Sequence, residues 1–67
     1  MKNLYPEAIL ELRAKLNLSQ TELANLLGVS FTSVNRWEKG HNEPTVLAKV
    51  KLKKLFKEND IKMGDEQ

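Results

Sequence analysis

The sequence predicts an all-α domain, a compact bundle of four to five short helices. Two observations lead to this class: apolar residues recur at helical spacing along most of the chain, and capping residues or glycines separate the periodic stretches. The 67 residues are enough for one small domain, near the lower size limit for a core without disulfides or metals. We expect one domain over 1–67, with a core at about 5–57 and a frayed tail over 58–67.

Composition excludes several kinds of site. The chain has no cysteine, so neither a disulfide nor a cysteine-ligated zinc site can form, and His41 alone cannot hold a metal. We therefore expect no metal and no cofactor. A Gly-rich phosphate loop and a nucleophile with a neighbouring base are both missing, so we expect no enzyme. Without a signal-peptide pattern or an apolar run of ~20 residues, a cytoplasmic protein that does not enter membranes is expected.

The first helix is expected over 6–16. Pro6 suits the first helical turn, where its missing N–H is not needed, and Glu7 complements the helix dipole there. The buried stripe of this helix is expected to consist of Ile9, Leu12 and Leu16, with Tyr5 and Ala8 at its edge.

Two further helices are expected at about 20–27 and 31–38. Ser19 and Glu22 form a capping box at the start of the first, and Gly28 supplies the left-handed residue that ends it. Ser30 caps the second, which Gly40 ends. Only two residues separate Gly28 from the next helical turn, so the two helices must cross steeply. This arrangement is a helix-turn-helix, whose second helix is of the kind that enters the DNA major groove.

A last helix is expected to begin after Pro44, with Thr45 or Glu43 as its cap, and to persist to about Lys57. Its apolar residues are more numerous than so small a core is expected to bury, and any exposed remainder would serve a homodimer or a partner. We place that excess at Leu52, Leu55 and Phe56. A basic block surrounds this helix without forming one stripe, and solvation is its expected role: Lys49, Lys51, Lys53, Lys54 and Lys57.

Over about residues 9–47, these features resemble the Cro/repressor-type helix-turn-helix family, also called the XRE or lambda-repressor-like family. The resemblance rests on the pairs and runs Leu12-Arg13, Leu18-Ser19-Gln20, Glu22-Leu23-Ala24, Leu27-Gly28-Val29-Ser30, Val34, Arg36-Trp37-Glu38-Lys39-Gly40 and Pro44. It implies a lambda-repressor-like fold, binding to double-stranded DNA and a role in prokaryotic or phage transcription regulation. A protein-interaction module with the same fold is the alternative, since the net charge of +2 is modest.

The outward face of the helix at 31–38 is expected to read bases. Arg36 suits bidentate pairing with guanine, and Thr32 can offer its methyl or hydroxyl group to a base edge. Asn35 can pair with adenine or turn to a phosphate instead. Phe31 departs from the polar residue of many relatives, and either contacts a thymine methyl or folds back as a hydrophobic plug. The expected base-reading residues are Phe31, Thr32, Ser33, Asn35 and Arg36.

A second group is expected to bind DNA phosphates. Ser19 and Gln20 open a helix whose backbone N–H groups and dipole favour an anion. The resemblance implies that the Gln20 amide either contacts the DNA backbone or braces the following helix. Residues just beyond the base-reading helix should lie along the other side of the groove. The expected phosphate-binding residues are Ser19, Gln20, Lys39, His41 and Asn42.

Arg13 borders the buried stripe of the first helix, where a charge needs a partner because unpaired burial is costly. Glu38 is the expected partner, and a solvent-exposed Arg13 is the alternative. The resemblance implies the same pair in relatives. Its role would be structural, orienting the base-reading helix. A homodimer through the C-terminal helix is also expected from the resemblance, and it would read two half-sites ~34 Å apart.

Overall fold

A computed structural model describes residues 3–63, and over this range the chain forms four α-helices and no strand. None of these helices has the length and apolar character needed to cross a membrane. The all-α class predicted from the sequence is confirmed. The helices are α1 (Tyr5–Leu16), α2 (Gln20–Leu27), α3 (Phe31–Lys39) and α4 (Val46–Glu58).

Local signals begin and end the two middle helices as expected. At the start of α2, the Glu22 backbone N–H donates to Ser19 Oγ at 3.0 Å, and the Ser19 N–H donates to the Glu22 carboxylate at 2.8 Å. Ser30 caps α3 by accepting from the backbone N–H of Ser33 at 3.1 Å. Gly28 and Gly40 follow the two helices with φ of 74° and 78°, a left-handed conformation that glycine adopts without strain.

The first and last helices are capped differently. The N-cap residue of α1, Leu4, makes no side-chain cap, and the backbone N–H of Tyr5 donates to Asn3 Oδ1 at 3.1 Å instead. The C-cap Asn17 is left-handed with φ of 56°. At α4, the hydroxyl of Thr45 accepts from the backbone N–H of Ala48 at 3.3 Å. Of the two caps considered for this helix, the structure therefore has Thr45, and the Glu43 carboxylate instead receives a hydrogen bond from Lys49.

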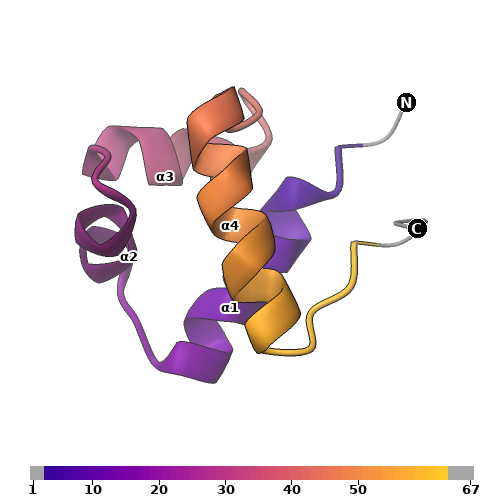
Figure 1. The fold of residues 1–67 in the computed structure, drawn as a ribbon. Coiled ribbons are helices and arrows are strands. Elements are labelled where there is room, and N and C mark those ends of the chain that lie inside the picture. The colour runs from indigo at the N-terminus through magenta and orange to yellow at the C-terminus, as the bar shows by residue number, and fades with distance from the viewer. Residues whose placement is uncertain (1–2, 64–67) are drawn as a thin grey trace.

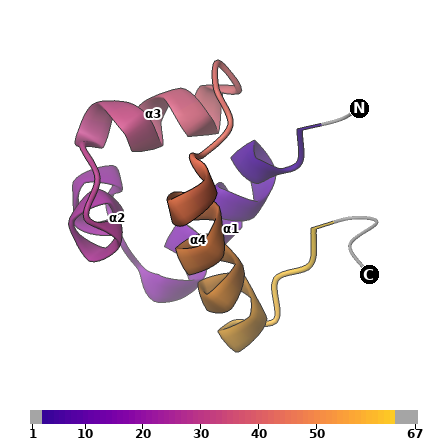
Figure 2. The same ribbon diagram turned by 45° about the horizontal axis from the view of Figure 1, so that its top comes forward.

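The four helices surround one core. In Figure 1, α2 is viewed nearly end-on while α3 lies across the view, so the two cross steeply. Figure 2 shows α3 along one side of the molecule, with α4 running away from it beneath. The side chains that meet in the core come from every helix, and they are Tyr5, Ala8, Ile9, Leu12, Leu23, Ala24, Leu27, Val34, Trp37, Ala48, Leu52, Phe56, Ile61 and Met63.

The segment after α4 corrects the expectation of a frayed tail that begins at 58. Ile61 and Met63 are both buried in the core. Asp60 is left-handed with φ of 59°, and this turns the chain so that the Ile61 N–H donates to the Phe56 carbonyl at 2.8 Å. Burial of two large apolar side chains offsets the entropy of ordering these residues. Residues 64–67 of the expected tail lie outside the described range.

The expected surplus of apolar residues on α4 is also placed differently. Leu52 and Phe56 are buried, and Leu55 is half-buried against the core, so the expectation that these three exceed the core was wrong. The exposed apolar residues of α4 lie in its first half instead. Val46, Leu47 and Val50 are 80%, 68% and 62% exposed, and we call these three residues the α4 patch.

Replacement of Ile61 tests whether this segment belongs to the folded core. We expect Ile61→Ala to lower the free energy of unfolding by about 2–4 kcal/mol, because it leaves a cavity beside Phe56. Urea denaturation followed by circular dichroism measures the loss. Lys62→Ala is the control, since Lys62 is exposed and its loss should change stability by less than about 0.5 kcal/mol. If both substitutions had equally small effects on the free energy of unfolding, this segment would be a frayed tail as first expected.

Candidate nucleic-acid interface

Helix α3 has two distinct faces. Val34 and Trp37 point into the core and are buried. On the opposite side Thr32 and Arg36 are exposed; they are four residues apart and so lie on one face of the helix. Lys39 continues this exposed face to the end of the helix. The helix therefore offers one polar, partly cationic face to the exterior.

The other three expected base-reading residues lie at the edges of that face. Phe31 is 50% exposed and does not belong to the core, which disfavours the interpretation of this residue as a buried plug. Ser33 is half-buried, and its hydroxyl lies 3.1 Å from that of Ser30 within the N-terminal cap. Asn35 is half-buried and hydrogen-bonded to a neighbouring helix.

Arg13 of α1 holds Glu38 of α3 through two hydrogen bonds. Nε donates to Oε2 at 2.7 Å, and Nη2 donates to Oε1 at 3.0 Å. The third nitrogen, Nη1, donates to the Leu18 carbonyl at 3.1 Å. Side-chain exposure is 23% for Arg13 and 7% for Glu38, so the pair is largely removed from solvent. The expected pair is present in the structure. Its hydrogen bonding raises the pKa of Arg13 above the usual value, so the guanidinium stays charged.

Gln20, the first residue of α2, extends this pair into a network. Its Nε2 donates to Glu38 Oε1 at 2.8 Å, and its Oε1 accepts from Asn35 Nδ2 at 3.2 Å. Of the two roles considered for Gln20, the structure contains the bracing of α3. The bond between Gln20 and Asn35 was not predicted, because their 15-residue separation carries no periodic signal. The network joins α1, α2 and α3 through hydrogen bonds and one ion pair.

The residues expected to bind phosphate fall into two groups. Ser19 is exposed at the N-terminus of α2, where its side chain caps the helix, and Gln20 follows it. At the other end, Lys39, His41 and Asn42 are exposed where α3 ends and in the loop that follows. Glu43 lies in that loop too, and Lys49 neutralises it through a 2.7 Å ion pair. Exposed donors therefore stand at both ends of the α2–α3 unit.

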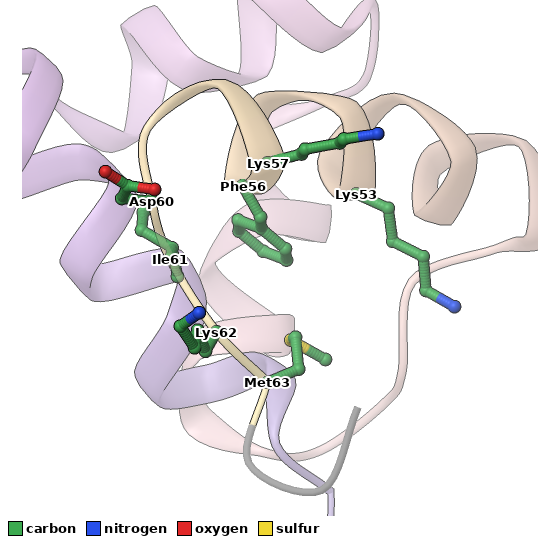
Figure 3. A pocket seen from close by; sticks show the side chains of 7 residues that line it. All are labelled: Lys53, Phe56, Lys57, Asp60, Ile61, Lys62 and Met63. Carbon is green, nitrogen blue, oxygen red and sulfur yellow. The ribbon is translucent and has the colours of Figure 1, made fainter. Parts of the chain in front are cut away.

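Other sites are few in the range 3–63. This range holds no group of His, Cys, Asp or Glu residues suited to a metal ion. A pocket lies where α4 ends (Figure 3), at the end of that helix remote from α3 (Figure 2). Its position separates it from the α3 surface, and its walls are formed by Lys53, Phe56, Lys57, Asp60, Ile61, Lys62 and Met63.

Comparison with known protein families identifies the family that has this arrangement of helices. The family model described as helix-turn-helix matches residues 9–57, which include α2, α3 and the network that joins them. The chain belongs to the helix-turn-helix family. This membership confirms the resemblance on which the sequence-based expectations rested, and the two helices of the motif are α2 and α3.

Two curated relatives come from species of Pyrococcus. A protein of Pyrococcus furiosus, named as a candidate HTH-type transcriptional regulatory protein, is 43% identical over 59 residues, which cover 88% of this chain and 19% of the relative. A protein of Pyrococcus abyssi with the same kind of name is 42% identical over 52 residues, covering 78% of this chain and 16% of the relative. The chain thus spans less than a fifth of the length of either relative. No solved structure matches it significantly.

Breaking the pair of Arg13 and Glu38 should destabilise the helix-turn-helix. Arg13→Ala leaves the Glu38 carboxylate without a cation at 7% exposure, and we expect it to cost about 2–3 kcal/mol in the free energy of unfolding. A double-mutant cycle with Glu38→Ala separates the pair from the other contacts of each residue. We expect a coupling energy of about 1–2 kcal/mol from urea denaturation of the four proteins. Additive effects would mean that the pair contributes nothing of its own.

Proposed function

We propose that this chain binds double-stranded DNA in a sequence-specific manner and acts as the DNA-reading part of a transcriptional regulator. Family membership supports a binding role rather than a catalytic one, and both Pyrococcus relatives are named as transcriptional regulatory proteins. α3 enters the major groove while α2 and the loop after α3 hold the phosphates on either side.

The observation that carries this proposal is the construction of α3. Its inner face is anchored by Val34 and Trp37 in the core and by the Glu38 network. Its outer face keeps the exposed side chains of Thr32 and Arg36. A rigid helix with a free polar face is the geometry that major-groove reading requires, since an anchored backbone fixes where each side chain meets a base edge. The same construction favours DNA over the alternative of a protein-interaction module.

Roles within the interface follow from position. Arg36 pairs with guanine O6 and N7, and Thr32 contacts a neighbouring base edge. Phe31, half-exposed at the start of α3, lies against a thymine methyl group. Ser33 and Asn35 flank this face. Ser19 and the backbone N–H of Gln20 bind phosphate at one side, and Lys39, His41 and Asn42 bind it at the other.

Gel-shift titrations over a range of salt concentrations test the interface. Affinity should fall steeply as salt rises, because phosphate contacts release counterions. Arg36→Ala should cost about 1–3 kcal/mol on the preferred duplex and relax the preference for one base pair. Lys39→Ala should instead weaken binding to all duplexes alike and reduce the salt slope by about one.

Lys57→Ala is a matched control, since it removes the same charge from the far end of α4. It should leave affinity and base preference close to those of the unmodified chain. If Arg36→Ala and Lys39→Ala are as silent as Lys57→Ala, then α3 does not face the DNA.

We further propose a two-fold homodimer through the α4 patch. Two copies of α4 packed antiparallel through the patch, crossing midway between residues 46 and 50, would bring Val46 of each copy against Val50 of the other. Apolar contact between these exposed residues supports a self-complementary surface.

Substitution in the patch tests the dimer. Leu47→Glu should shift the sedimentation equilibrium toward monomer and abolish cooperative binding to a duplex with two half-sites spaced by ~34 Å. Leu26→Glu is the control, because Leu26 is a 55% exposed residue of α2 outside the patch. The dimer would be contradicted if the unmodified chain sediments as a monomer, both when free and when bound to a two-site duplex.

A further inference from the structure

We propose that Gln20 is a positioning residue that determines which end of the Asn35 amide faces the DNA. The consequence is a preference, at the base that Asn35 meets, for the amino bases adenine and cytosine over the keto bases guanine and thymine. This inference rests on the DNA binding proposed above, and it assigns one element of the sequence preference.

The first step is the chemistry of Glu38. Its two oxygens already receive Arg13 Nε and Nη2, and Oε1 also receives Gln20 Nε2 at 2.8 Å. A carboxylate paired with a guanidinium accepts hydrogen bonds and donates none. The NH₂ end of the Gln20 amide must therefore face Glu38, because its carbonyl end would place two acceptors against each other.

The second step passes this direction to Asn35. With its NH₂ group committed to Glu38, Gln20 presents Oε1 to α3, and this oxygen needs a donor. Asn35 supplies one, since its Nδ2 donates to Gln20 Oε1 at 3.2 Å. The carboxylate of Glu38 thus sets the orientation of the Asn35 amide through the Gln20 amide that lies between them.

The third step concerns the oxygen that remains. Asn35 Oδ1 accepts no hydrogen bond from the residues that the structure describes, and the same range contains no buried side-chain oxygen or nitrogen without a partner. Oδ1 therefore reaches solvent. Asn35 follows Thr32 by three residues and precedes Lys39 by four, which places it at the edge of the exposed face of α3. An outward-facing acceptor stands beside the residues expected to read bases.

Base-edge chemistry then determines the preference. In the major groove, adenine N6 and cytosine N4 donate hydrogen bonds, whereas thymine O4 and guanine O6 accept them. An unlocked asparagine can turn either end of its amide toward a base and so tolerates both classes. With Oδ1 held outward, an amino group that meets this oxygen is satisfied, whereas a keto oxygen in the same place would face another acceptor. We expect about a tenfold preference for amino over keto bases at this one position.

The experiment compares selections from a random duplex pool. Asn35→Ala first identifies the base position that Asn35 meets, since its preference alone is lost. Gln20→Met keeps the length of the side chain and removes both hydrogen bonds, so the Asn35 amide is free to turn. We expect the amino-over-keto preference to fall from about tenfold to within about twofold, while the preference that depends on Arg36 persists.

Two further variants keep the result interpretable. Thr21→Met is the matched control, because Thr21 is the exposed neighbour of Gln20 and takes no part in the network; its preferences should equal those of the unmodified chain. Glu38→Gln approaches the same network from its other end. A glutamine there can meet Gln20 in either orientation, so the preference should relax again. If circular dichroism shows that Gln20→Met does not fold, the Glu38→Gln variant is used for the test instead.

Three outcomes would overturn the inference while DNA binding stands. They are a keto preference at the Asn35 position, an Asn35→Ala variant that weakens all duplexes alike as a phosphate contact would, and an amino preference that survives both Gln20→Met and Glu38→Gln. Failure of the unmodified chain to enrich any duplex would instead refute the proposed function itself.

Discussion

The carboxylate of Glu38 is the constraint on which the rest of this small domain depends. It lies largely out of water, where an unpartnered charge would cost several kcal/mol. Its partners come from two other helices, Arg13 of α1 and Gln20 of α2. Because α3 contributes only Val34 and Trp37 to the buried core, apolar packing alone leaves this helix few anchors. Directional hydrogen bonds to Glu38 supply the orientation that packing cannot.

Much of the fold could be predicted because its signals are local. Ser19, Ser30 and Thr45 each cap a helix through a backbone N–H three residues on, and such a pattern is visible in the sequence. The partnership of Arg13 with Glu38 was also predictable, since a charge at the border of a buried stripe needs a partner. Agreement between local preference and tertiary structure is the usual mark of a sequence that specifies one fold.

What could not be predicted depends on three-dimensional placement. Ile61 and Met63 follow the last helix without periodicity, so their burial depends on a turn at Asp60 that returns the chain to the core. The exposure of Leu47 and Val50 was missed for the converse reason, because helical spacing does not reveal which face finds a neighbour. The bond between Gln20 and Asn35 likewise exists only because α2 and α3 cross. The roles of the DNA-facing residues remain predictions, supported by exposure and position.

The basic block of α4 illustrates how a charge count differs from available charge. Lys49 is engaged with Glu43 and lies 5.5 Å from the centre of the Tyr5 ring. Lys51 reaches across to α2 and donates to the Leu27 carbonyl at 3.1 Å, where the negative end of that helix dipole favours a cation. Two of the five lysines of this block thus make contacts within the domain. Because a hydrogen bond to a neutral carbonyl cancels no charge, only Lys49 is offset by a carboxylate, and the attraction of this helix for a polyanion is weaker than its composition suggests by that one charge. Acylation of Lys51 would loosen a helix junction as well as remove a charge.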